Sequence, residues 1–166
     1  FDNCILLGSF SKTATPGMRV GYLVCKNAEL LETIAAAKES SDVHTSVLSQ
    51  YVLYDYLTHN DYDGHIAEIR ALYESQCKTM LDAMSECFPA SVSYTRPDGG
   101  MFIWCTLPEG KTALDFFYEA VECKVAVAPG DPFYTAPKAV RTFRLNYTNA
   151  SKEEIREGIR RLGTLL

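Results

Sequence analysis

The 166-residue chain has no long apolar stretch, no run of basic residues and no pair of cysteines separated by two residues. The first absence argues against a membrane-spanning helix, which needs about 20 predominantly apolar residues in succession. The formal net charge of −5, without a basic run, argues against a nucleic-acid-binding surface. We therefore expect neither membrane nor nucleic acid as a partner of this segment.

Metal ligands in a recognisable spacing are also missing. The six cysteines and three histidines form no pattern typical of a metal site. Several cysteines lie among apolar neighbours, as in Leu23-Val24-Cys25 and Ile103-Trp104-Cys105. We interpret them as reduced thiols in the core of a cytoplasmic protein, and we predict no metal.

Hydrophobic residues make up 47% of the chain, which is enough to bury a core in one domain or in two small units. Short apolar runs predict strands of a buried sheet at Cys4–Leu7 and Val20–Cys25. Apolar residues with helical spacing then predict three helices, over Ala28–Ser40, Val47–Leu57 and Asp61–Phe88, the last of them stopped by Pro89. Thr45 or Ser46 is the expected cap of the second helix.

Beyond Pro89 the pattern changes to short strands mixed with helices. Strands are predicted at Ser91–Thr95, Met101–Leu107, Val125–Ala128 and Thr142–Thr148, and helices over Thr112–Glu122 and Ser151–Leu166. Ser151 and Glu154 have the spacing of a capping box at the start of the last helix. Strands and helices in this mixture predict an α/β protein.

One lysine lies directly beyond the first predicted strand. Lys12 lies among the hydroxyl groups of Ser9 and Ser11, and Arg19 follows seven residues later. Pro16-Gly17 favours a tight turn that returns Arg19 toward Lys12. The amine could hold an aldehyde covalently while the hydroxyls and the guanidinium bind a phosphate. The alternative interpretation is an exposed loop lysine with a solvated arginine.

The segment Ser-Phe-Ser-Lys-Thr at 9–13, with the following Pro-Gly, Arg19 and Gly-Tyr, resembles the cofactor-lysine motif of the class I/II aminotransferases of fold type I. The resemblance implies that pyridoxal 5'-phosphate is held as a Schiff base on Lys12, the catalytic residue. Ser9, Arg19 and more weakly Ser11 are the implied ligands of its phosphate. The seven-residue step is closest to the subgroup of 2-aminoadipate-type aminotransferases and MocR-type regulators.

A second arginine lies in the middle of the strand predicted at Thr142–Thr148. Alternation along the strand places Arg144, Asn146 and Thr148 on one face and the apolar residues on the other. A salt bridge or a solvent-facing arginine would explain Arg144 equally well from this pattern alone. Arg-Leu-Asn-Tyr at 144–147 resembles the aminotransferase strand whose arginine binds the substrate α-carboxylate, and this implies that role for Arg144.

Two further segments resemble parts of the family that lie near the substrate. They are Gly99-Gly100-Met101-Phe102, which a hairpin turn explains adequately, and the loop that contains Phe133 and Tyr134. The aromatic pair in that loop either shapes a side-chain pocket or packs in the core. His44 is not expected to act as an acid or base, because the released lysine amine carries the proton in this chemistry.

The resemblance also implies the organisation of the chain. We expect the end of the large pyridoxal-phosphate-binding domain at 1–60 and a small C-terminal α/β domain, with a sheet flanked by helices, at 61–166. The chain is then the C-terminal part of a longer enzyme, expected to form a homodimer and to be inactive as a fragment. The expected reaction moves an amino group between an amino acid and a 2-oxo acid. The alternatives are a MocR-type transcription regulator that senses pyridoxal phosphate and a pyridoxal-phosphate-dependent amino-acid decarboxylase.

Overall fold

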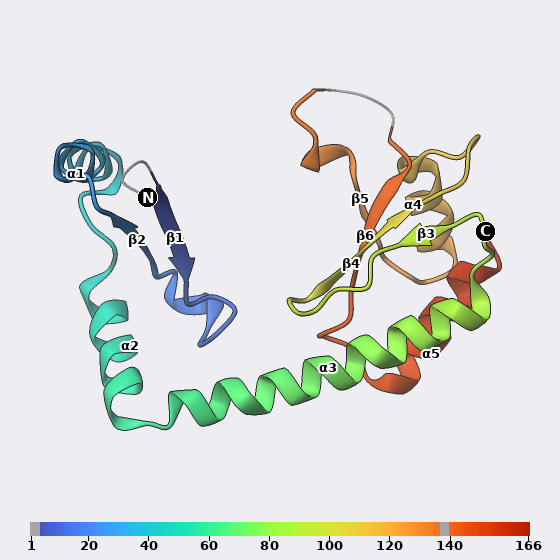
Figure 1. Ribbon diagram of the computed structural model, residues 1–166, viewed down its shortest axis with the longest axis horizontal. Helices are drawn as coiled ribbons and strands as arrows, with labels where there is room; N and C mark the ends of the chain where they lie inside the picture. The colour runs from blue at the N-terminus through green and yellow to red at the C-terminus, as the bar shows by residue number, and fades with distance from the viewer. Residues whose placement is uncertain (1–3, 137–139) are drawn as a thin grey trace. The chain divides into compact units, whose positions relative to one another are not determined.

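The computed structural model describes residues 4–136 and 140–166, and the chain divides into two compact units, Phe1–Ala67 (unit 1) and Glu68–Leu166 (unit 2). The division falls within α3 (Tyr62–Cys87), the helix that was predicted to end at Pro89. Figure 1 shows the order of the elements along the chain. None of the helices in the described ranges is long and apolar enough to cross a membrane.

Unit 1 consists of a strand pair followed by helices (Figure 1). β1 (Ile5–Ser9) pairs antiparallel with β2 (Gly21–Cys25). Ser9 is paired with Gly21, so the two ends of the connecting loop lie next to each other. α1 (Ala28–Asp42) begins at Asn27, whose side-chain oxygen accepts a hydrogen bond from the backbone N–H of Leu30 at 3.0 Å.

Helix α2 (Val47–His59) follows α1 in unit 1. Its cap is Ser46, one of the two predicted caps, and the Ser46 hydroxyl accepts a hydrogen bond from the backbone N–H of Ser49 at 3.4 Å. Unit 1 therefore contains the predicted strands and helices, with shifts of a few residues at their ends.

The prediction that β1 and β2 belong to a buried sheet is wrong for unit 1. Leu6 is 61% exposed, Leu7 76% and Val24 52%. Leu53 of α2 is the only buried hydrophobic residue among residues 4–67. A sheet of two strands has little surface of its own to bury, and the apolar runs that suggested burial are equally compatible with an open strand pair.

Unit 2 contains a four-stranded antiparallel sheet with the order β3-β4-β6-β5. The strands are β3 (Ser93–Tyr94), β4 (Phe102–Thr106), β6 (Thr142–Asn146) and β5 (Ala128–Pro129). β5 lies at an edge, where the missing N–H of a proline is tolerated.

Strand β5 begins later than the sequence predicts, at Ala128 rather than at Val125. Lys124 adopts a left-handed backbone with φ 62°, and the Val125 N–H donates to the carbonyl of Ala120 at 2.9 Å. Val125 therefore ends the turn that follows α4 (Ala113–Glu122) and does not start a strand.

Three helices supply the core of unit 2 together with one face of the sheet (Figure 1). They are α4, the C-terminal half of α3 and α5 (Lys152–Gly163). The predicted capping box of α5 is confirmed: the Ser151 hydroxyl accepts from the Glu154 N–H at 3.2 Å, and the Glu154 carboxylate accepts from the Ser151 N–H at 2.8 Å.

The buried face of the sheet carries Ile103 and Cys105 of β4 and Phe143 and Leu145 of β6, all of them at most 5% exposed. The alternate residues of the same strands, among them Arg144, lie on the other face and are partly exposed. This confirms the predicted alternation around Arg144, and the mixture of helices and sheet confirms the predicted α/β class.

Candidate functional site

The lysine loop, residues 10–20, connects the paired ends of β1 and β2. The Phe10 N–H donates to the Val20 carbonyl at 3.2 Å, so the strand pairing continues one step into the loop. The N–H groups of Thr13 and Ala14 both donate to the Phe10 carbonyl, at 3.3 and 2.9 Å. These bonds close a tight turn that carries Lys12, whose side chain is exposed.

The two predicted serines are brought together next to this lysine. The Ser11 N–H donates to the side-chain oxygen of Ser9 at 3.2 Å. The Ser9 hydroxyl accepts in this bond, so its own proton remains available for an acceptor such as a phosphate oxygen.

Arg19 follows a short 3-10 helix, η1 (Pro16–Met18), and adopts a left-handed backbone with φ 54° and ψ 41°. Its Nη1 donates to the Pro16 carbonyl at 3.2 Å, which uses one of the five N–H donors of the guanidinium. A residue other than glycine in this region of backbone conformation is unfavourable, and such residues cluster at functional sites. No hydrogen bond joins Arg19 to Lys12 within the described part of the chain.

The charge of the lysine loop fits a phosphate-bearing aldehyde. Lys12 and Arg19 are both cationic, no Asp or Glu occurs between Gly8 and Tyr22, and neither cation forms an ion pair with any residue in 4–136 or 140–166. The Lys12 amine, the hydroxyls of Ser9 and Ser11 and the Arg19 guanidinium form a donor set that fits the aldehyde and the phosphate of pyridoxal phosphate.

Arg144 of β6 lies on the open face of the sheet in unit 2. It pairs in register with Trp104 on one side and Ala128 on the other. Its Cζ lies over two aromatic rings, 3.9 Å from the centroid of Phe102 and 4.6 Å from that of Phe133. The side chain of Arg144 makes no hydrogen bond or ion pair with the described residues, so the salt-bridge interpretation has no support among them.

The aromatic residues around Arg144 were not predicted as a group. Phe133 lies in the 3-10 helix η2 (Asp131–Phe133), and its ring meets Trp104 edge to face with 5.3 Å between centroids. The alternation of Phe102 and Trp104 along β4 was visible in the sequence. The register that brings them beside Arg144 was not.

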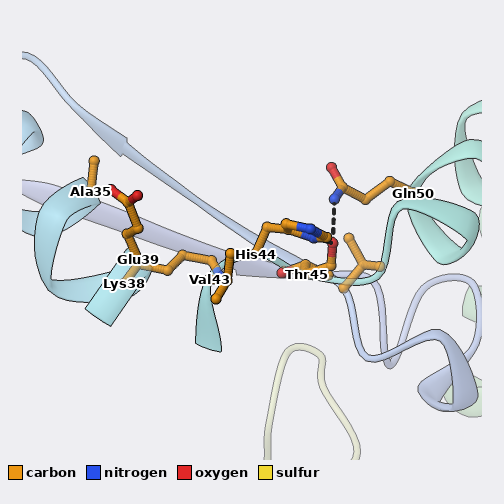
Figure 2. Close-up of a pocket in the computed structure, with 9 residues that line it drawn as sticks. Ala35, Lys38, Glu39, Val43, His44, Thr45 and Gln50 are labelled. Atoms are coloured by element: carbon orange, nitrogen blue, oxygen red, sulfur yellow. Dashed lines mark hydrogen bonds between the residues drawn. The ribbon is translucent and has the colours of Figure 1, made fainter. Parts of the chain in front are cut away.

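Figure 2 shows a pocket in unit 1, with a volume of about 340 Å³. It is lined by Val20 and Gly21 at the end of the lysine loop, by residues of α1 such as Lys38, and by His44 and Gln50, but not by Lys12 or Arg19. The Gln50 amide donates to the Thr45 carbonyl at 2.8 Å, and Nδ1 of His44 lies 3.0 Å from the same oxygen. These contacts tie His44 to the backbone of its own segment.

Comparisons with known proteins agree with these observations. The model of the family "Aminotransferase class I and II" matches residues 2–162. The 2-aminoadipate transaminase of Thermus thermophilus is 39% identical over 166 residues, which are 100% of this chain and 41% of that protein. The HTH-type transcriptional regulator NorG of Staphylococcus aureus is 28% identical over 161 residues, 96% of this chain and 36% of that protein.

A solved structure shows the same fold. The α-aminoadipate aminotransferase LysN of Thermus thermophilus, complexed with N-(5'-phosphopyridoxyl)-L-leucine, superposes with a TM-score of 0.92 at 38% identity. The alignment covers 99% of this chain and 42% of that one, so the chain spans about 40% of the length of these relatives. The predicted fold type I is thereby confirmed. From the family match and this shared fold we conclude that the chain belongs to the aminotransferase class I and II family.

Proposed function

We propose that this chain supplies the cofactor lysine and the substrate-binding arginine of a pyridoxal-phosphate-dependent aminotransferase. The observation that carries the proposal is the lysine loop: Lys12 lies on a tight turn next to Ser9 and Ser11, Arg19 follows on the same loop, and no carboxylate neutralises either cation. The reaction moves an amino group between an amino acid and a 2-oxo acid.

Lys12 attaches the cofactor and moves a proton. Pyridoxal phosphate, when bound, withdraws electrons from the α-carbon of the amino acid and makes the α-proton acidic. The amine of Lys12 would be the base that accepts this proton and returns it during the transfer. The turn closed onto the Phe10 carbonyl holds the lysine backbone, while the exposed side chain is free to move.

Ser9, Ser11 and Arg19 bind the phosphate in this proposal. The bond from the Ser11 N–H to Ser9 keeps the two serines adjacent, and the left-handed backbone of Arg19 sets the direction of its side chain. A guanidinium can donate two parallel hydrogen bonds to a phosphate, which a lysine amine cannot.

Arg144 binds the α-carboxylate that all amino-acid substrates share. Its guanidinium lies against two rings and has no acidic partner among the described residues, which leaves its N–H donors for a carboxylate. Of the alternatives, the transcription regulator has a relative at 28% identity against 39% for the aminotransferase, so we favour the enzyme.

The organisation of the whole protein is part of the proposal. We assign residues 1–60 to the large cofactor-binding domain and 61–166 to the small domain.

We also propose a homodimer, since α2 exposes apolar side chains such as Leu48 and Tyr51 that a second copy would cover. The cytoplasm is the proposed location because all six cysteines are free thiols. Light scattering after size-exclusion chromatography measures the mass, and the mass of a single chain would contradict the dimer.

Covalent trapping tests the proposed function. The protein that carries this chain is incubated with pyridoxal phosphate, reduced with borohydride and digested, and the labelled peptide is identified by mass spectrometry. We expect the pyridoxyl group on Lys12 and no label in a Lys12→Ala variant. A label on Lys26 or Lys38 instead would overturn the proposal. Release of carbon dioxide from the amino acid, in place of a 2-oxo acid product, would identify a decarboxylase.

A further inference from the structure

We propose that Phe102 and Phe133 are positioning residues that hold the guanidinium of Arg144 in place for the substrate carboxylate. This inference rests on the proposed function, because it concerns how the carboxylate-binding arginine is held. The resemblance only places Phe102 and Phe133 near the substrate; the inference gives both rings the role of holding the arginine, with Trp104 supporting Phe133.

The rings replace the polar contacts that usually fix an arginine. The Arg144 side chain makes no hydrogen bond or ion pair with the described residues, yet its Cζ lies 3.9 Å from the Phe102 centroid and 4.6 Å from the Phe133 centroid. Contact through the face of the guanidinium restricts its rotation while the N–H groups at its edge stay unused. An arginine held by a carboxylate of the protein would have to give up that partner before it could bind a substrate.

Each ring is itself held by the fold. Phe102 is the first residue of β4 and pairs with Asn146, so its backbone is fixed two residues along β6 from Arg144. Phe133 lies in η2, where its N–H donates to the Gly130 carbonyl at 2.9 Å. Its ring rests edge to face on Trp104, the direct cross-strand neighbour of Arg144.

Gly130 keeps η2 close to β6. Its N–H donates to the Thr142 carbonyl at 2.7 Å, and a Cβ at this position would collide with the Thr142 side chain and backbone. The Tyr134 hydroxyl lies 3.1 Å from the Thr142 hydroxyl and adds a second link. Phe133 is thus tied to β6 on both sides, although its side chain is 49% exposed.

The test uses two probes, propanoate and 3-phenylpropanoate, titrated into the cofactor-loaded protein and followed by cofactor absorbance. Both carry the carboxylate, but only the second has a bulky side chain. For Phe102→Leu and Phe133→Leu we expect both probes to bind roughly 3- to 10-fold more weakly, by the same factor for each probe. Phe133→Tyr, which keeps the ring, should bind both probes like the wild type.

The matched control is Tyr118→Leu, which removes a 61% exposed aromatic side chain from α4 of the same unit and should change neither affinity. Weakening of 3-phenylpropanoate alone would overturn the inference and assign Phe133 to a side-chain pocket. Unchanged affinities in both leucine variants, while Arg144→Ala loses both probes, would also overturn it and leave the proposed function intact. If Arg144→Ala binds both probes normally, the proposed function fails and the inference fails with it.

Discussion

Gly8 of β1 lies directly opposite Tyr22 of β2, and the tyrosine ring covers the glycine so closely that a Cβ at position 8 would collide with the ring. The same ring packs against Phe10 with 5.5 Å between centroids. The last residues of β1 and the start of the lysine loop are therefore held by one side chain from the opposite strand.

This contact makes Gly8→Ala a test of the strand end that supports Lys12. The added methyl group must displace the Tyr22 ring, so we expect weaker cofactor binding without a change at Lys12 itself. The double variant Gly8→Ala/Tyr22→Leu removes the collision and should recover part of the lost affinity. Cofactor titration of both variants measures this, and equal affinities in the single and double variants would contradict the contact.

Arg19 offers a comparison between two truncations. Arg19→Ala keeps a side chain in the left-handed conformation, whereas Arg19→Gly removes both the guanidinium and the backbone strain. We expect both variants to bind cofactor roughly 10- to 150-fold more weakly, which corresponds to about 1.5–3 kcal/mol for a charge-assisted hydrogen bond. Fluorescence titration measures the affinity. Wild-type affinity in Arg19→Gly would show that the guanidinium does not bind the phosphate.

Arg144→Lys keeps the positive charge and removes the planar pair of donors. We expect KM to rise for every amino-acid substrate together, while the cofactor spectrum stays unchanged, because the α-carboxylate is common to all of them. Steady-state kinetics with three amino acids of different side chains measures the effect. A rise in KM for one substrate only would move Arg144 to a side-chain site.

The capping box predicts a stability change in unit 2. Ser151→Ala removes the acceptor for the Glu154 N–H, so the free energy of unfolding should fall by about 1 kcal/mol. Ser151→Gly should cost only a few tenths of a kcal/mol, roughly, because glycine is tolerated at this position. Urea unfolding followed by the fluorescence of Trp104, the one tryptophan of the chain, measures both. An equal loss in both variants would contradict a role for the cap.

Alkaline pH should destabilise unit 2 through its buried thiol. Burial raises the pKa of Cys105 to about 12 from its usual value of 9.0. As the pH rises, the thiol therefore loses its proton in the unfolded chain before it does so in the folded chain. The contribution of the protonated thiol to the free energy of unfolding is complete below pH 9 and is lost as the pH rises toward 12. Burial likewise raises the pKa of Tyr147 to about 12, with the adjacent Cys77 adding to the effect.

The variant Cys105→Ala separates the effect of this thiol on the pH dependence of stability from the effects of other groups. Its free energy of unfolding should decline less steeply with pH than that of the wild type, by at most about 1.4 kcal/mol per pH unit. Urea unfolding at several pH values between 7 and 12 gives the slopes, and the value at pH 7 gives the packing cost of the substitution. Identical slopes in the two proteins would contradict the raised pKa of Cys105.

Local patterns predicted much of this fold. The alternation around Arg144, the cap of α5 and the end of α3 before Pro89 all follow from neighbouring residues, and the structure confirms them. The exposure of β1 and β2 could not be predicted in this way, because an apolar run does not say whether another layer covers it.

Parts of the candidate site depend on contacts between distant segments. The pairing of Trp104 with Arg144 is a cross-strand register, and Phe133 reaches the same place from a short helix in a different segment. The left-handed backbone of Arg19 is also invisible in the sequence, because arginine has no preference for it and only the turn imposes it.

In β4 and β6 of unit 2, the odd-numbered residues lie on the buried face of the sheet and the even-numbered residues lie on the open face. Ile103, Cys105, Phe143 and Leu145 are committed to the core, whereas Phe102, Trp104 and Arg144 lie on the open face and contribute little to that packing. Substitutions on the open face can therefore change what the protein binds at a small cost in stability. A laboratory selection for new amino-acid substrates should retain Arg144 and the rings that hold it, leave the odd positions alone, and accumulate its changes at the other even positions, such as Thr106 and Asn146.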